Sequence, residues 1–200
     1  PKQDPETAEL KQKLIIEAAK KLFREEGFDS VSMRKIAAAV DMGAMSLYKY
    51  FSNKNDILHH IWEAFFVELF TGLQEKVLAE HSYDAKFRVA CHEYLNYWFK
   101  HPDRFRMVFL NEDRAESQSS FFFHHADIET RMNQVFLPLA QSVLLAKSHE
   151  QLLRMIQGLI CHMHGIALNL ITISEYQWPN HKALLDAYLE LLIDAPPDAS

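Results

Sequence analysis

SMRKIAAAVDMGAMSLYKYFSNK, residues 32–54, contains two short helical patterns separated by a turn. The first pattern has apolar residues at the i, i+3, i+4 and i+7 positions of one helix face, namely Met33, Ile36, Ala37 and Val40. Ser32 stands where an N-cap hydroxyl is needed. Asp41-Met42-Gly43 then breaks the pattern, and we expect Gly43 to adopt the backbone angles of a sharp turn between two helices. These features predict a helix-turn-helix.

The second helix of the pair is expected over Ala44–Phe51. At about 100° per residue, Leu47 and Phe51 share its apolar face, and the opposite face is small, flexible and singly charged. Tyr48 and Tyr50 fall on the two flanks, where their hydroxyls can reach backbone phosphates on either side of a groove. This arrangement is typical of a recognition helix that enters the major groove of DNA.

The candidate DNA-binding residues form two groups, according to the part of the DNA that each would contact. The base edges would be read by Ala44, Met45, Ser46 and Lys49. The DNA backbone would be contacted by Ser32, Tyr48, Tyr50 and Lys54. Lys54 falls in the first turn of the next expected helix, where the helix N-terminus and an ammonium group together suit a phosphate. An amphipathic surface helix can show the same pattern, so the surrounding sequence has to agree.

A longer run does agree. It consists of AAKKLF at 18–23, EEGF at 25–28, the SxxxIA pattern at 32–37 and LYKYFSNKNDIL at 47–58. In order and spacing, this run resembles the N-terminal DNA-binding domain of the TetR family of transcriptional regulators. Two positions depart from the family pattern: Gly43 replaces the more usual Ser or Thr cap, and Met45 replaces a small residue. The resemblance covers about the first quarter of the chain.

The net charge of −6 ordinarily argues against binding to nucleic acid, but its distribution along the chain is compatible with DNA binding. Residues 1–54 carry ten Lys and Arg against eight Asp and Glu, whereas residues 55–200 carry eleven against nineteen. The positive end of the chain is therefore the end that contains the motif. Two cysteines and the lack of a signal-peptide pattern favour a cytoplasmic protein.

The predicted fold is all-α, with a helix-turn-helix DNA-binding domain of three helices at residues 1–54 and a helical ligand-binding and dimerisation domain at 55–200. The expected helices cover residues 10–26, 32–40, 44–51, 54–80, 84–100, 102–110, 121–146, 150–174 and 181–193. Residues 1–9 are expected to lack fixed structure, and Gly27 to end the first helix. Asn111–Ser120 is a polar loop that could cover a pocket. Leu152–Ile173 is the most apolar stretch, but its polar interruptions favour a buried helix over a membrane span.

The C-terminal part is rich in aromatic residues, most of which would form its core. Small-ligand pockets in helical domains are also lined by such residues, with a few polar groups between them. The candidate pocket residues are Phe87, Cys91, Tyr94, Trp98, Phe105, Phe109, Met132, Phe136 and His162. The TetR resemblance implies an inducer pocket in this domain, and we expect a small apolar or aromatic ligand.

Metal and enzyme chemistry find little support in the sequence. Cys91-His92, His124-His125 and the Cys161/His162/His164 group lack the spacing of a complete ligand set. A Glu-x-x-His pair, a zincin motif and a phosphate-binding glycine loop are all missing. We therefore expect no cofactor and no catalytic activity.

The last two helices are candidates for a subunit interface. Small and polar residues follow one strip of the penultimate helix: Gly158, His162, Gly165 and Asn169. Such a strip serves either packing within the chain or a twofold interface, and the apolar character of these helices favours the interface. The TetR resemblance implies the same homodimer contact. The sequence as a whole predicts a ligand-responsive repressor of a palindromic operator; the alternative is a small-molecule carrier or interaction protein with a degenerate DNA-binding module.

Overall fold

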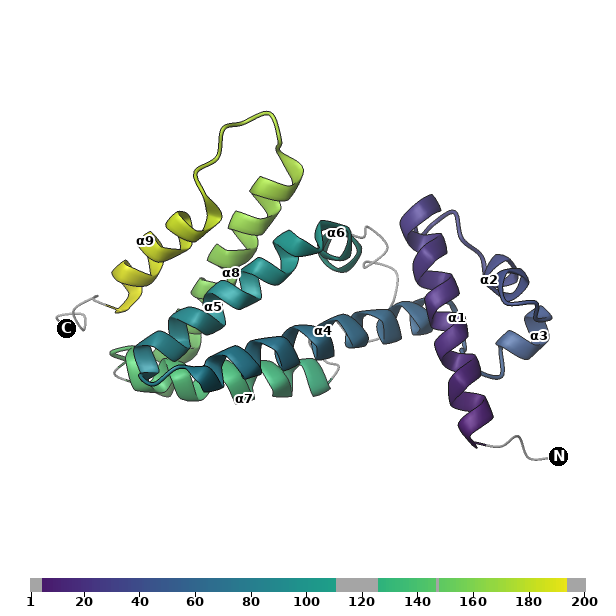
Figure 1. Ribbon diagram of the computed structural model, residues 1–200, viewed down its shortest axis with the longest axis horizontal. Coiled ribbons are helices and arrows are strands. Elements are labelled where there is room, and N and C mark those ends of the chain that lie inside the picture. Colours follow the sequence, from purple (N-terminus) through teal and green to yellow (C-terminus); the bar gives the residue numbers. More distant parts are fainter. Residues whose placement is uncertain (1–4, 111–125, 147, 194–200) are drawn as a thin grey trace. The chain divides into compact units, whose positions relative to one another are not determined.

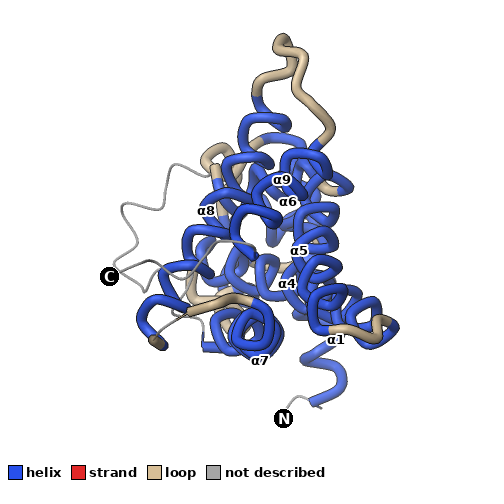
Figure 2. Tube along the Cα trace, turned by 90° about the vertical axis from the view of Figure 1, so that its left-hand side faces the viewer, coloured by secondary structure: helices blue, strands red, loops and turns tan. Residues whose placement is uncertain are grey.

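The computed structural model describes residues 5–110, 126–146 and 148–193. All regular secondary structure in these ranges is helical (Figure 2), which confirms the all-α prediction. The helices, labelled in Figure 1, are α1 (Pro5–Glu26), α2 (Met33–Ala39), α3 (Ala44–Leu47), α4 (Lys54–Ala79), α5 (Tyr83–Lys100), α6 (Pro102–Phe109), α7 (Ala126–Val143), α8 (His149–Thr172) and α9 (His181–Ile193). The candidate lid Asn111–Ser120 and the pair His124-His125 lie outside the described residues.

The described chain forms two compact units. One contains residues 5–66 and 103–110, and the other contains residues 67–102 together with the described residues from 126 to 193. The division falls within α4, between Phe66 and Val67. A functional boundary at residues 54 and 55 remains a prediction.

The first helix of this unit, α1, ends at Glu26 and is followed by Gly27, as predicted. Gly27 has a φ of 81° and its N–H donates to the Phe23 carbonyl at 3.1 Å. The rings of Phe23 and Phe28 lie 5.0 Å apart, which completes the C-terminal cap. The beginning of this helix was predicted wrongly, because α1 starts at Pro5 and not at Leu10. Proline fits the first turn of a helix, where its missing N–H has no intrahelical partner.

The core of the first unit joins α1 to the helix-turn-helix. Ile15 and Ala19 of α1, Ile36 of α2 and Leu47 of α3 are fully buried. Figure 1 shows α1 beside α2, and these helices are in contact. At the other end of the unit, Phe65 of α4 is buried beneath two cations, Lys20 of α1 at 5.5 Å and Arg104 of α6 at 4.7 Å from its ring centroid. The apolar faces predicted for α2 and α3 thus contribute Ile36 and Leu47 to this core.

The second unit is organised around α5, which contacts α7, α8 and α9. Ser82 and Ser148 cap α5 and α8, accepting hydrogen bonds from the N–H groups of Ala85 and Gln151 at 3.1 Å each. Pro138 lies inside α7, which continues to Val143 without a restart. The expected bounds of α5, α8 and α9 therefore hold to within a few residues, whereas the expected start of α7 at residue 121 lies outside the described residues.

Candidate nucleic-acid interface

Ser32 caps the first helix of the motif, as predicted. Its side-chain oxygen accepts a hydrogen bond from the Lys35 N–H at 3.2 Å, and the residue is exposed. The Lys35 ammonium pairs with Glu26 near the end of α1. The Ser32 hydroxyl hydrogen is not used by the cap, so it can still be donated to a DNA phosphate.

The turn between α2 and α3 differs from the prediction. Gly43 has ordinary extended angles, with φ −71° and ψ 145°, and it is the N-cap of α3. The left-handed residue of the turn is Asp41, with a φ of 52°. Aspartate tolerates this region better than most residues because its short polar side chain can bond locally. The sequence argument assigned the left-handed position to the only glycine in the turn, and this assignment was wrong.

The recognition helix is shorter than the predicted range Ala44–Phe51. Regular α3 ends at Leu47, and residues 48–50 continue as turns. The Lys49 N–H donates to the Ser46 carbonyl at 3.3 Å, and the Tyr50 N–H to the Leu47 carbonyl at 2.9 Å. These bonds join residues three apart, so the chain tightens after a single helical turn.

The structure exposes the predicted outward face of this segment and buries its apolar face. Leu47 and Phe51 are buried, whereas Met45 is 81% exposed, Tyr48 is 51% exposed and Lys49 is also exposed. The other predicted contacts of the segment are half-buried: Ala44, Ser46 and Tyr50. An 81% exposed methionine beside a lysine is the arrangement expected of a surface that contacts another molecule.

Lys54 has a partner within the protein. Its Nζ donates to the Phe28 carbonyl at 2.9 Å and lies 4.0 Å from the centroid of the Phe28 ring. The start of α4 is further ordered by Asn53, whose Oδ1 accepts from the Asp56 N–H at 2.9 Å. The Asp56 carboxylate accepts from the N–H and hydroxyl of Ser52, at 2.8 and 2.9 Å. A phosphate contact by Lys54 therefore remains a prediction. The ammonium group has three N–H donors, and such a contact would use one that is not bonded to the Phe28 carbonyl.

One residue of this surface was missed by the sequence argument. Lys11 of α1 lines a hollow of about 320 Å³, here named the α1–α3 hollow, together with Asp41, Met42, Gly43, Ser46, Lys49 and Tyr50. Lys11 lies far from the motif in the sequence, and it resembles an ordinary solvated lysine there. In the structure Lys11 lies in the second turn of α1, which begins at Pro5.

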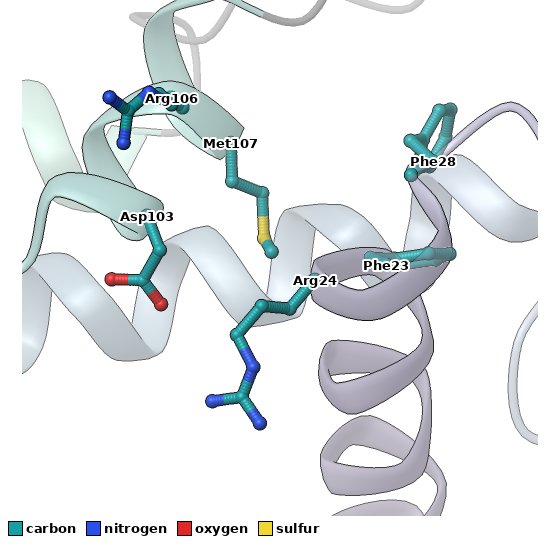
Figure 3. Close-up of a pocket in the computed structure, with 7 residues that line it drawn as sticks. Phe23, Arg24, Phe28, Asp103, Arg106 and Met107 are labelled. Atoms are coloured by element: carbon teal, nitrogen blue, oxygen red, sulfur yellow. The ribbon is translucent and has the colours of Figure 1, made fainter.

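A second cavity of the first unit lies between α1 and α6 (Figure 3). Its volume is about 390 Å³, and its walls are Phe23, Arg24, Gly27, Phe28, Asp103, Arg106 and Met107. Figure 3 shows Met107 pointing from α6 into the space between the two helices. The charges of both signs and the apolar walls do not single out one class of ligand.

The nine predicted pocket residues fall in both compact units. Phe105 and Phe109 of α6 belong to the first unit, where their rings lie 4.9 Å apart. In the second unit, Phe87, Cys91 and Trp98 are fully buried. Burial raises the pKa of the Cys91 thiol well above its ordinary value. The structure thus places most of these residues as core side chains, and their role in ligand binding remains a prediction.

Tyr94 occupies the centre of this aromatic core. Its ring lies 6.0 Å from that of Phe136 and 6.2 Å from that of Trp98, and its hydroxyl is 2.7 Å from Nε2 of His164. Burial raises the pKa of the Tyr94 hydroxyl above its ordinary value. His164 was not among the predicted pocket residues, although its position three residues after Cys161 had been considered for metal binding. The apolar periodicity of α8 did not indicate that His164 faces α5.

His162 lies where α8 meets α9. Its ring is stacked on Tyr188 at a centroid distance of 3.9 Å, and burial lowers its pKa. A Cβ added at Gly158 would lie 3.5 Å from the Tyr188 hydroxyl. His162 also lines a hollow of about 330 Å³ with Cys161, Gly165, Ile166, Asn169, Leu170, Trp178 and Leu184. At least part of the small-residue strip of α8 therefore serves packing within the chain.

Among the described residues, the structure brings together no group of three His, Cys, Asp or Glu side chains that could hold a metal ion. In the same part of the chain, α8 is the one helix long and apolar enough to cross a membrane, and 22% of its most apolar window is buried.

A comparison with known proteins agrees with the geometry of the N-terminal unit. Residues 15–61 match the family model described as bacterial regulatory proteins of the tetR family. The N-terminal domain belongs to the TetR family. This TetR domain is also 40% identical, over 47 residues, to an HTH-type transcriptional regulator of Staphylococcus aureus strain USA300. The alignment spans 24% of this chain and 25% of that relative.

Solved structures resemble the whole chain, beyond the TetR domain. The fatty acid degradation regulator FadR from Bacillus halodurans has a TM-score of 0.61 and 14% identity, with 98% of each chain covered. The regulator FadR from Bacillus subtilis, solved in complex with stearoyl-CoA, has a TM-score of 0.61 and 17% identity, with 92% of this chain and 98% of that one covered. At this identity the likeness establishes a shared fold.

Proposed function

We propose that this protein is a homodimeric transcriptional repressor that leaves a palindromic operator when a small molecule binds its C-terminal domain. The observation that carries the proposal is the TetR domain itself. Its α3 segment buries Leu47 and Phe51 and leaves Met45, Tyr48 and Lys49 on the surface. Ala44, Met45, Ser46 and Lys49 then face the bases, and the flanking tyrosines with Ser32 and Lys54 hold the DNA backbone.

The proposed dimer uses α8 and α9. Both helices are apolar and only partly covered within the chain, with Leu168 and Ile173 each 40% exposed and Leu191 73% exposed. Large apolar side chains in this number favour a partner surface over solvent. Twofold symmetry would place the two α3 segments on half-sites about 34–36 Å apart or a multiple of that distance.

The proposed ligand is apolar or aromatic, because the core of the second unit is rich in aromatic side chains with a few polar groups among them. The hydroxyl of Tyr94 and the imidazole of His164 form the central polar pair, at 2.7 Å. Release from DNA requires the ligand to bind the DNA-incompetent state more tightly, since equal affinity for both states shifts neither population. Long-chain acyl-CoA is the first class to test, because FadR from Bacillus subtilis was solved with stearoyl-CoA.

The test begins with selection from a random duplex library by the full-length protein, followed by affinity measurements at several salt concentrations. We expect one enriched palindrome, bound by a dimer with strong salt dependence. The double variant Tyr48→Ala with Lys49→Ala should lose this binding. Tyr83→Ala with Lys86→Ala is the matched control, since it removes a tyrosine and a lysine from α5 of the other unit.

Four outcomes separate the parts of the proposal. Weak binding without sequence preference, equal in the two double variants, would contradict DNA recognition and favour a carrier or interaction protein in the cytoplasm. A palindrome bound by a monomer would contradict the dimer. Operator release by stearoyl-CoA or by another apolar compound would support the repressor mechanism, whereas tighter DNA binding with such a compound would indicate a corepressor.

A further inference from the structure

We propose that the α1–α3 hollow seats one phosphate of the DNA backbone, held between the ammonium groups of Lys11 and Lys49. This inference rests on the proposed DNA-binding function and deepens it, because it makes α1 part of the interface. It also revises the role given to Lys49 under the proposed function, from reading a base edge to holding the DNA backbone.

The geometry joins three elements of one compact unit. Lys11 comes from the second turn of α1, Asp41 from the turn after α2, and Ser46, Lys49 and Tyr50 from α3 and the turns that follow it. The hollow has a volume of about 320 Å³. It directly adjoins the segment that exposes Met45 and Tyr48, so a duplex lying on that segment brings its backbone to the hollow.

The charges of the hollow favour an anion. Neither Lys11 nor Lys49 forms an ion pair with another described residue, whereas Lys20 and Lys35 of the same unit pair with Glu17 and Glu26. Asp41 offsets only one of the two ammonium charges. Two unpaired cations facing one space repel each other, and an anion between them removes this repulsion.

The other polar groups of the hollow indicate which anion. Ser46 and Tyr50 carry hydroxyls that can donate to oxygen atoms, as a phosphodiester requires. The single negative charge of a phosphodiester matches the net charge of +1 that Lys11, Lys49 and Asp41 carry together. A free inorganic phosphate ion offers similar chemistry, so the experiment has to distinguish it from DNA.

The experiment measures the affinity of full-length variants for the selected palindrome and for base-substituted versions, as a function of salt. Each neutralised phosphate contributes about 0.9 to the slope of log K against log salt, or about eightfold in affinity per tenfold dilution of salt. We expect Lys11→Ala to lower the slope by about 0.9 per subunit and to weaken all duplexes by the same factor. Lys11→Arg, which keeps the charge, should restore the wild-type slope.

Two further variants make the test specific to this hollow. Lys13→Ala removes an exposed charge about 200° around α1 from Lys11 and should leave the slope unchanged. Asp41→Asn removes the opposing charge while keeping a residue that tolerates a positive φ, and it should strengthen binding to all duplexes severalfold. Thermal unfolding of each variant confirms that the fold is retained.

The phosphate itself can be located with duplexes in which single phosphates are replaced by neutral methylphosphonates. One replacement should weaken the wild type and have no further effect on Lys11→Ala. Inorganic phosphate added at constant ionic strength should not displace the duplex; displacement would indicate a site for the free ion.

The inference is overturned if the wild type binds the palindrome and Lys11→Ala keeps its slope, or if Lys13→Ala lowers the slope equally. A loss confined to one base pair would also contradict a phosphate contact. If the wild type selects no palindrome, the proposed function fails first, and this inference fails with it.

Discussion

Lys54, the first residue of α4, donates a 2.9 Å hydrogen bond to the carbonyl of Phe28 and lies 4.0 Å from the centroid of the Phe28 ring. Phe28 follows the Gly27 cap of α1. The Lys54 side chain therefore connects the start of α4 to the end of α1. The helix-turn-helix between them is thereby closed into a single packed body. Lys54, which was predicted to contact a phosphate, thus has a structural role in the protein without DNA.

Lys54→Met should therefore lower the free energy of unfolding by about 1–2 kcal/mol, even in the absence of DNA. Methionine keeps the apolar stem but leaves the Phe28 carbonyl without its donor. Chemical denaturation followed by circular dichroism measures the change. Lys49→Met is the control, because the Lys49 ammonium has no ion-pair partner among the described residues; equal stabilities of the two variants would contradict a structural role for Lys54.

The two glycines of the domain should respond oppositely to serine. Gly27 has a φ of 81°, where a side chain costs about 1–2 kcal/mol, so Gly27→Ser should destabilise the protein by that amount. Gly43 has extended angles at the N-cap of α3, with open space around its Cα. Gly43→Ser should stabilise the protein by about 0.5–1 kcal/mol, because serine supplies the missing cap. Destabilisation of both variants, measured by denaturation, would contradict the assignment of Asp41 as the left-handed residue of the turn.

Met45 offers a test of base reading that is separate from electrostatics. It is 81% exposed and uncharged, so its contact with DNA is limited to apolar atoms such as a thymine methyl group. Met45→Ala should reduce discrimination at one base position by about tenfold, or ~1.4 kcal/mol, with little change in binding to random duplex DNA. Affinity for a complete set of single-base operator variants measures this effect, and uniform weakening across the set would assign Met45 to the backbone.

The two cysteines should differ sharply in reactivity. Cys161 is exposed, whereas Cys91 is fully buried and its pKa is raised by that burial. At pH 8 a disulfide reagent should modify one thiol rapidly and the second only as the protein unfolds. Cys161→Ser should abolish the fast phase. A fast phase that persisted in this variant would show that Cys91 is reached by solvent, as an open ligand pocket beside it would allow.

Acidification should weaken the packing of α9 on α8. Burial lowers the pKa of His162, and a hydrogen bond with the Leu184 backbone only partly opposes it. The unfolded chain therefore binds a proton at this histidine at a higher pH than the folded chain does. Its contribution to stability is complete above the unfolded pKa and is lost as the pH falls from there towards the folded pKa.

Replacement of this residue isolates its share of the pH dependence. His162→Phe keeps a ring to stack on Tyr188 but cannot be protonated, so the melting temperature should fall less than in the wild type between pH 7 and pH 5. His92→Phe is an unsuitable control, because His92 is hydrogen-bonded to Asp186 at 2.6 Å and its replacement would also remove that bond. Parallel pH profiles of wild type and His162→Phe would show that another group governs the acid response.

The existence and order of the helices, the helix-turn-helix and the resemblance to the TetR family were all predicted from local patterns in the sequence. Apolar spacing, Ser32 and Gly27 act within a few residues of chain, so the local sequence is enough to specify the elements they begin, end and orient. The same spacing correctly separated the buried Leu47 and Phe51 from the exposed Tyr48 and Lys49.

Contacts between groups from distant segments could be identified only in the folded chain. The helical period gives the buried face of a helix but not the neighbour that covers it, so the partner of Lys54, the pairing of Tyr94 with His164 and the place of Lys11 beside Lys49 could not be derived. The backbone angles of the turn were also out of reach. Asp41 and Gly43 are both able to adopt a positive φ, and in the folded chain it is Asp41 that does so.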